Sequence, residues 1–132
     1  MTRAGNKTSE GHVLDACRLE LGSEPDLALF RNAVVHAEYW DAKTGKVIHV
    51  HGGLPVGSQD LVGIGPGRCH ACNAVTRGHF FGLEIKRPGE KLRPEQETFA
   101  ALVRRAGGFS GWATSAEEAR ACLLRARKGE LS

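Results

Sequence analysis

The segment from Phe80 to Lys86 constrains the fold of this chain more than any other. Its first six residues, 80–85, are rich in aromatic and branched apolar side chains without helical spacing, which predicts a buried strand. Successive strand side chains point to opposite faces, so Glu84 and Lys86 share one face, about 6–7 Å apart, while Ile85 points into a core. Because charges at the end of a buried strand are costly unless they are paired or bind a ligand, this strand predicts a functional site.

The rest of the pattern predicts alternating helices and strands. Ser9 is a helix N-cap, and the helix that follows carries an apolar stripe of Val13, Leu14, Cys17 and Leu21 and ends at Gly22. Further elements are predicted as strands at 29–36, 46–51, 59–64 and 109–113 and as helices at 94–106 and 115–127. We expect the first two strands to form a hairpin and residues 65–78 to form a polar excursion. This order predicts an α/β fold with a mixed β-sheet flanked by helices.

Length and composition fit one globular domain. The chain has 132 residues, 41% of them hydrophobic and 25% charged, which allows a single core. No apolar run reaches the ~20 residues of a membrane span, and the polar N-terminus lacks the apolar region of a signal peptide. We therefore expect a cytoplasmic protein without a membrane partner. Its expected parts are a flexible leader over 1–8, a domain over 9–127 and a tail over 128–132.

The charge balance permits contact with nucleic acid without requiring it. The chain carries 18 basic and 15 acidic residues, a net charge of +3. Basic residues gather directly after the strand that ends in Glu84, at Lys86, Arg87, Lys91 and Arg93. This cluster is either a solvated face or a set of phosphate contacts. The arginines and lysine near the C-terminus are expected to form a solvated face.

Two carboxylates are candidates for a divalent metal site. Asp60 lies near the start of one predicted strand and Glu84 near the end of another, so they face each other if the strands are neighbours. Mg²⁺ and Mn²⁺ take oxygen ligands, and two carboxylates with a backbone carbonyl, such as that of Ile85, would suffice. Such a metal lowers the pKa of a bound water, and Lys86 could orient that water or offset charge on a phosphate. The alternative is that Glu84 and Lys86 form a surface ion pair.

An ordered set of residues surrounds this pair. In chain order the set contains Glu10, Arg31-Asn32, the stretch 57–63 around Asp60, Glu84-Ile85-Lys86, Leu92, Gln96, Gly107-Gly108 and the helix that opens at Ser115. With this set the chain resembles the VRR-NUC (virus-type replication-repair nuclease) family of the PD-(D/E)xK nuclease superfamily over about residues 9–124. The resemblance implies a restriction-endonuclease-like fold and identifies residues 9–127 as the nuclease domain.

The resemblance also implies roles for individual residues. Asp60 and Glu84 would be metal ligands and Lys86 the catalytic lysine. Glu10 would complete the site or help to hold a second metal, although Glu20 and Glu24 could compete for that role. Gln96 would point back toward the site. Contacts to DNA would come from four basic residues, Arg31, Arg87, Lys91 and Arg93.

The implied function is a Mg²⁺- or Mn²⁺-dependent DNA endonuclease. Stand-alone members of the family resemble junction-resolving enzymes, so the resemblance implies branched DNA such as four-way junctions, a homodimer, and a phage origin with action in the host cytoplasm. Two departures from the family pattern concern Gln59, which stands in place of the proline of the superfamily name, and the long loop between Asp60 and Glu84. A non-catalytic DNA-binding module stays open as an alternative.

Four cysteines in a chain without a signal peptide argue against a disulfide framework. Cys17 and Cys122 fall in helical patterns and are expected to be small buried hydrophobes. Cys69 and Cys72, with His70 and His79 nearby, form a CxxC pair that could be half a zinc site, for which His49 and His51 are the candidate further ligands. Because no second CxxC exists, we expect a flexible loop with free thiols rather than zinc. A zinc-stabilised adaptor that uses Cys69 and Cys72 is the remaining alternative.

Overall fold

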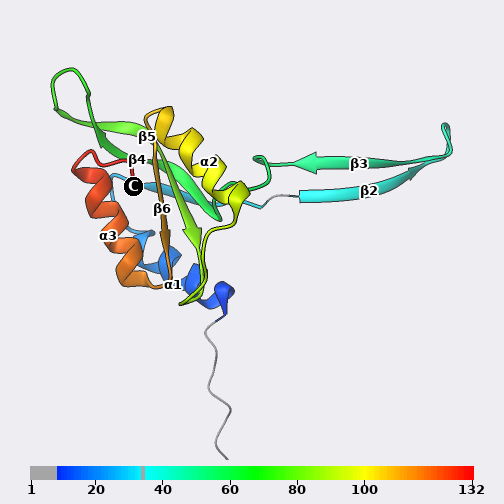
Figure 1. The fold of residues 1–132 in the computed structure, drawn as a ribbon, viewed down its shortest axis with the longest axis horizontal. Helices are drawn as coiled ribbons and strands as arrows, with labels where there is room; N and C mark the ends of the chain where they lie inside the picture. Colours follow the sequence, from blue (N-terminus) through cyan, green and yellow to red (C-terminus); the bar gives the residue numbers. More distant parts are fainter. Residues whose placement is uncertain (1–8, 34) are drawn as a thin grey trace, which may run out of the picture.

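A four-stranded sheet in the order β1-β4-β5-β6 forms the centre of the protein (Figure 1). Its strands are β1 (Ala28–Arg31), β4 (Leu61–Arg68), β5 (Val75–Ile85) and β6 (Phe109–Ala113). The first three pair antiparallel, whereas β6 runs parallel to β5, so the sheet is mixed as predicted. The structure is a computed structural model that describes residues 9–33 and 35–132, so the leader expected over 1–8 lies outside the described residues.

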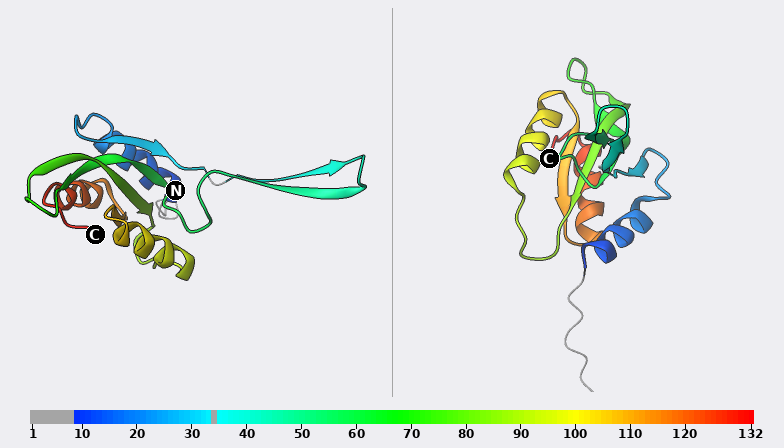
Figure 2. Two further views of the ribbon diagram at one scale, coloured as in Figure 1. Left: turned by 90° about the horizontal axis from the view of Figure 1, so that it is seen from above. Right: turned by 90° about the vertical axis from the view of Figure 1, so that its right-hand side faces the viewer.

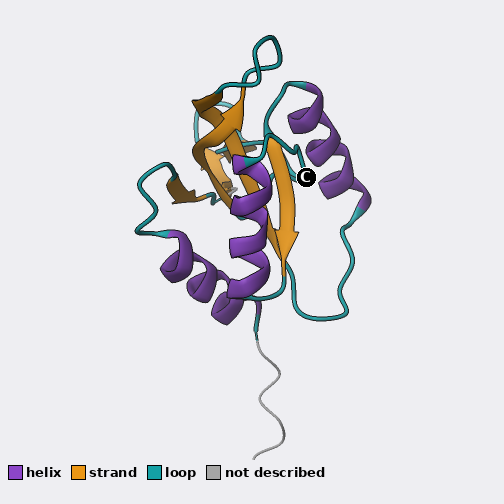
Figure 3. Ribbon diagram, turned by 90° about the vertical axis from the view of Figure 1, so that its left-hand side faces the viewer, coloured by secondary structure: helices purple, strands orange, loops and turns teal. Residues whose placement is uncertain are grey.

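Helices cover both faces of this sheet (Figures 2 and 3). α1 (Glu10–Leu21) and α3 (Ala116–Arg127) pack together on one face, and α2 (Pro94–Arg105) lies on the other. The core lies between the sheet and the pair α1 and α3; its buried side chains include Cys17, Leu21, Leu61, Phe81, Leu83, Ile85, Cys122 and Leu123. The predicted caps are present, because Ser9 Oγ accepts from the His12 N–H and Ser115 Oγ from the Glu118 N–H. The prediction of an α/β fold flanked by helices is confirmed.

The predicted strand at 29–36 is wrong as a single element. Its first half is β1 in the main sheet, whereas its second half begins β2 (Val35–Asp41), which pairs with β3 (Lys46–Gly52) in a separate two-stranded sheet. This hairpin, here called the arm, projects away from the body (Figures 1 and 2). The chain leaves the main sheet at Asn32, whose N–H donates to the Asp60 carbonyl at 2.8 Å.

The predicted polar excursion at 65–78 is also wrong. β4 continues to Arg68 and β5 begins at Val75, so the two strands form one long hairpin with a turn at 69–74. The register shifts between Gly65 and Gly67, which marks a bulge. At Gly67 a Cβ would collide with the ring of His79, so the glycine permits close packing here rather than a loop.

The C-terminal residues 128–132 lie against the body. The Ser110 N–H donates to the Leu131 carbonyl at 2.9 Å, and Arg125 Nε donates to the Ser132 carbonyl at 3.2 Å. None of the helices in the described part of the chain has the length and apolar character needed to cross a membrane.

Candidate functional site

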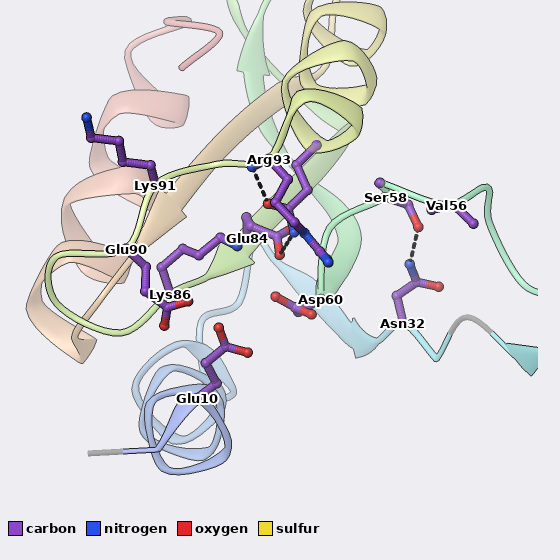
Figure 4. A pocket seen from close by; sticks show the side chains of 12 residues that line it. Glu10, Asn32, Val56, Ser58, Asp60, Glu84, Lys86, Glu90, Lys91 and Arg93 are labelled. Atoms are coloured by element: carbon purple, nitrogen blue, oxygen red, sulfur yellow. Dashed lines mark hydrogen bonds between the residues drawn. The ribbon is translucent and has the colours of Figure 1, made fainter. Parts of the chain in front are cut away.

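An open cleft of about 510 Å³ lies where the start of β4 and the end of β5 meet the N-termini of α1 and α2 (Figure 4). Its lining contains seven of the residues predicted from sequence, namely Glu10, Asp60, Glu84, Lys86, Lys91, Arg93 and Gln96. These residues come from the start of α1, from the residue before β4, and from the continuous stretch 84–96 between the end of β5 and the first turn of α2. The fold therefore brings together most of the predicted site.

The Asp60 side chain is attached to the end of β5 by a hydrogen bond from a backbone N–H. The pairing of β4 with β5 stops at Leu61 opposite Leu83. Just beyond it, Asp60 Oδ2 accepts from the Ile85 N–H at 2.8 Å, in place of the next strand-to-strand bond. In an antiparallel pair the N–H and C=O of one residue face the same neighbour, so the Ile85 carbonyl is also directed toward the Asp60 side. A carboxylate and a backbone carbonyl thus meet at this edge.

Glu84 is a buried carboxyl with one free oxygen. Its side chain is only 5% exposed, and Oε1 accepts from Gln96 Nε2 at 2.9 Å. Oε2 is buried and has no hydrogen-bond partner among the described residues. Burial raises the pKa of Glu84 to about 9, with a further increase from the adjacent Asp60 carboxyl. The Glu84 carboxyl therefore holds a proton near neutral pH unless a cation compensates its charge.

Gln96 fixes the orientation of Glu84. It is the third residue of α2 and is buried, and its Oε1 accepts from the Arg93 N–H at 2.9 Å. The same amide therefore caps α2 and donates to Glu84, which gives it the orientation toward the site that was expected.

Lys86 lies among the four acidic side chains of the cleft, which are Glu10, Asp60, Glu84 and Glu90 (Figure 4). Lys86 is buried, and its N–H donates to the Ala113 carbonyl at 3.0 Å, which fixes its backbone to β6. Burial raises the pKa of Glu10, and the carboxyl of Glu90 raises it further, while the charge of Lys86 opposes the increase. Glu90 belongs to the loop 86–93 and was not predicted as a site residue.

Glu10 is the helix acid of the cleft, whereas its two competitors lie elsewhere. Glu20 and Glu24 pair with Arg120 on α3, and Glu24 pairs also with Arg127. Within residues 9–33 and 35–132, no three His, Cys, Asp or Glu side chains are grouped closely enough to hold a metal ion. A cation held by Asp60 and Glu84 would therefore need the Ile85 carbonyl and water as further ligands.

The loop that carries Asp60 is held by residues for which no role was predicted. Asn32 Nδ2 donates to Ser58 Oγ at 2.8 Å and to the Gln59 carbonyl at 2.9 Å. Gly57 has a φ of 92°, and a Cβ there would collide with the carbonyl of Glu95 at the start of α2. Asn32 and Gly57 belong to the ordered set of residues in the sequence, but their positioning role depends on contacts that no local pattern reveals.

Gln59, which stands where the superfamily name has proline, points away from the cleft lining. It is buried, and Nε2 donates to Ser110 Oγ at 2.6 Å on β6. Gly82 leaves room for this side chain, because a Cβ at that position would overlap the Gln59 amide. Gln59 therefore links the Asp60 loop to β6.

The predicted DNA-contact residues divide into two groups. Lys91 and Arg93 line the cleft. Arg87 instead pairs with Glu90 at 2.8 Å, and Arg31 is exposed at the end of β1 without lining the cleft. Positive charge at the cleft itself therefore comes from Lys86, Lys91 and Arg93.

No family model, curated protein or solved structure matches the chain. The function must therefore be argued from the residues themselves. The carboxyl groups of Asp60 and Glu84 and the buried Lys86 line one cleft, whose basic rim is formed by Lys91 and Arg93. This set can hold a divalent cation beside a polyanion and can stabilise negative charge that develops there.

Proposed function

We propose that the protein is a divalent-metal-dependent DNA endonuclease of the PD-(D/E)xK type, with the restriction-endonuclease-like fold and the VRR-NUC relationship that its sequence resemblance implies. The observation that supports this proposal best is the unpartnered Oε2 of Glu84, buried next to Asp60 and facing the same cleft as Lys86. The ionised form of a carboxyl buried in this way is costly unless a cation compensates its charge. Oxygen ligands favour Mg²⁺ or Mn²⁺ over softer metals.

Each residue would have a distinct task. Asp60, Glu84 and the Ile85 carbonyl would hold the metal, which when bound acts as a Lewis acid and activates a water for attack on phosphorus. Lys86 would hold that water or stabilise the charge on the phosphate oxygens. Gln96 would keep Glu84 in position, and Glu10 would supply the additional carboxylate on the α1 side of the cleft.

The substrate we propose is DNA, with branched forms such as four-way junctions preferred. Lys91 and Arg93 at the rim would contact phosphates, so binding should weaken steeply with salt. The preference for junctions and the homodimer are inferred from the resemblance, and two sites in a symmetric dimer would cut two strands. Such an enzyme would act in the cytoplasm, which would be that of the host for a phage-encoded protein.

A cleavage assay with matched variants tests this proposal. A labelled four-way junction and a linear duplex of the same sequence are incubated with Mg²⁺, Mn²⁺ or EDTA. We expect metal-dependent cutting of the junction by the unmodified protein and by Lys128→Ala, which removes an exposed lysine at the end of α3. Lys86→Ala should bind the junction but not cut it. Junction binding without cutting in any divalent metal would instead identify a non-catalytic DNA-binding module.

A further inference from the structure

The turn between β4 and β5 carries Cys69 and Cys72 at the tip of the long hairpin, at the opposite end of β5 from Glu84 (Figure 1). Cys69 and Cys72 are both free, Cys69 is partly exposed, and Cys72 is exposed. The Cys72 thiol and the N–H groups of Ala71 and Cys72 lie near the Cys69 sulfur. These contacts lower the pKa of the Cys69 thiol and favour its thiolate form.

The turn is closed by its own hydrogen bonds. The Cys69 N–H donates to the Ala74 carbonyl at 2.9 Å, and the Asn73 N–H donates to the Cys69 carbonyl at 2.8 Å. Asn73 adopts a φ of 59°, a left-handed conformation that Asn tolerates better than most residues. Arg68 Nη1 donates to the Asn73 carbonyl at 3.0 Å and braces the turn from the strand.

This geometry suits a zinc ion better than a hard cation. Two thiolates separated by two residues are the common first half of a structural zinc site. Zn–S bonds of about 2.3 Å in a tetrahedral arrangement place two sulfur ligands about 3.8 Å apart, which agrees with sulfurs that already approach each other. The guanidinium of Arg68 lies next to the turn and would offset the negative charge of a thiolate site.

The described side chains of one chain do not supply the two further ligands that tetrahedral zinc requires. His49 lies on the arm, on the opposite side of the molecule (Figure 1), and the side chain of His51 lies outside the described part of the structure. His79 Nε2 is engaged with Thr76 Oγ1 at 2.6 Å. In the described chain, neither His70 nor His79 joins the two cysteines in a three-residue metal group.

We propose that Cys69 and Cys72 form a zinc-binding turn and that one Zn²⁺ is shared by two copies of the chain, each of which supplies two thiolates. The ion would lie on the two-fold axis of a dimer joined at the hairpin tips. Four thiols would lose their protons to the buffer as four Zn–S bonds form, with no change of oxidation state. The tip lies roughly 30 Å from the cleft along β5, so zinc binding and DNA cleavage can be tested separately.

The test uses the full chain, purified under reducing conditions and freed of metal with a chelator. ZnCl₂ is added, and native mass spectrometry and analytical ultracentrifugation measure the stoichiometry and the mass. We expect one zinc per two chains and a dimer that dissociates on chelation. Co²⁺ in place of zinc should give the absorption of a tetrahedral site with four thiolates.

Two serine variants in the same turn provide the comparison. Cys72→Ser should lower zinc affinity by more than about a hundredfold, since losing a ligand costs at least as much as losing a group that supports one. His70→Ser keeps both thiols and removes an imidazole that is not part of the proposed site, and it should bind zinc and dimerise like the unmodified protein.

Four results would overturn the inference. They are one zinc per chain in a monomer, a dimer of unchanged mass in the chelator, equal zinc binding by both variants, and no zinc binding at micromolar concentrations with both thiols reduced. These measurements do not involve DNA, so a negative zinc result would not affect the nuclease proposal. Failure of the nuclease assay would equally not affect the zinc proposal.

Discussion

Gln96 Nε2 donates a hydrogen bond of 2.9 Å to Glu84 Oε1, and this bond joins the first turn of α2 to the end of β5. Since the Gln96 Oε1 also accepts from the Arg93 N–H, the amide has no freedom to turn away from Glu84. The loop 86–93, which carries the basic rim of the cleft, is thereby held at both of its ends: by the Lys86 N–H on β6 and by Gln96.

This bond predicts a positioning role for Gln96. Gln96→Leu retains the volume but leaves Glu84 Oε1 without its donor, and we expect the Mg²⁺ concentration for half-maximal cleavage to rise about tenfold to a hundredfold. The rate at saturating Mg²⁺ should fall less. The exposed neighbour Glu97 provides a control, because Glu97→Ala should change neither quantity. A cleavage rate that falls equally at all Mg²⁺ concentrations would contradict a role in metal binding.

The pKa of Glu84 predicts how stability depends on pH. Its value rises from an ordinary 4.5 to about 9 in the folded protein, so the folded state holds a proton that the unfolded state releases. The stabilising contribution is complete below pH 4.5 and is lost as the pH rises through 9. In EDTA the melting temperature should therefore fall over this range, and Glu84→Gln should flatten the fall and melt higher at pH 8.

Bound Mg²⁺ should counteract the fall of the melting temperature at high pH, since it replaces the proton on Glu84. Mg²⁺ should raise the melting temperature of the unmodified protein more at pH 8 than at pH 6, and its binding should release a proton to the buffer. Calorimetry in buffers of different ionisation enthalpy measures that proton. Equal pH profiles for the unmodified protein and Glu84→Gln would show that Glu84 ionises normally.

The contact between Gly57 and α2 predicts an intolerant position. Gly57→Ala introduces a Cβ that collides with the Glu95 carbonyl and also strains a φ of 92°. Gly45 in the turn of the arm has a φ of 65° but no atom within 4 Å of a Cβ, so Gly45→Ala carries the strain without the collision. We expect Gly57→Ala to lose more than about 2 kcal/mol of stability and Gly45→Ala about 1 kcal/mol. Urea denaturation measures the free energy of unfolding of both variants. Equal losses of stability would show that the collision at Gly57 does not contribute.

The basic rim predicts the salt dependence of DNA binding. Lys91→Ala and Arg93→Ala should each reduce the slope of log affinity against log salt by about 1, because each would remove one phosphate contact. Arg87→Ala should have a smaller effect, since this guanidinium already pairs with Glu90. Arg18→Ala, on an exposed part of α1, is the control. Fluorescence anisotropy between 50 and about 300 mM salt measures these slopes. Identical slopes for all four variants would show that Lys91 and Arg93 do not contact DNA phosphates.

Elements with a local signal could be predicted from the sequence. α1, β6 and α3 have the predicted bounds within a residue or two, because a capping side chain or a glycine marks their ends. The charged end of β5 also indicated where the cleft lies, since Glu84 and Lys86 break an otherwise apolar pattern and both line the cleft.

Elements defined by distant contacts could not be predicted. Nothing between Arg31 and Val35 signals a strand end, and the break there depends on hydrogen bonds from Asn32 to Ser58 and Gln59. β4 was predicted too short because its glycines suggested a loop. A Cβ at Gly67 would collide with the ring of His79 on β5, so close packing of neighbouring strands outweighs the low strand propensity of glycine. Glu90 was missed for the same reason, as only the folded loop brings it to Glu10.

The arm is joined to the body at its base, and this affects how freely its sequence and length can vary. Val35 and Gly52 pair at its base, so the polypeptide departs from the body and returns at one place. No residue of the arm contributes to the hydrophobic core as described. The residues between Val35 and Gly52 can therefore be shortened, lengthened or replaced by a foreign sequence while Asn32 and Asp60 keep their positions. This hairpin is thus a suitable place to insert a tag or a segment with a new binding specificity.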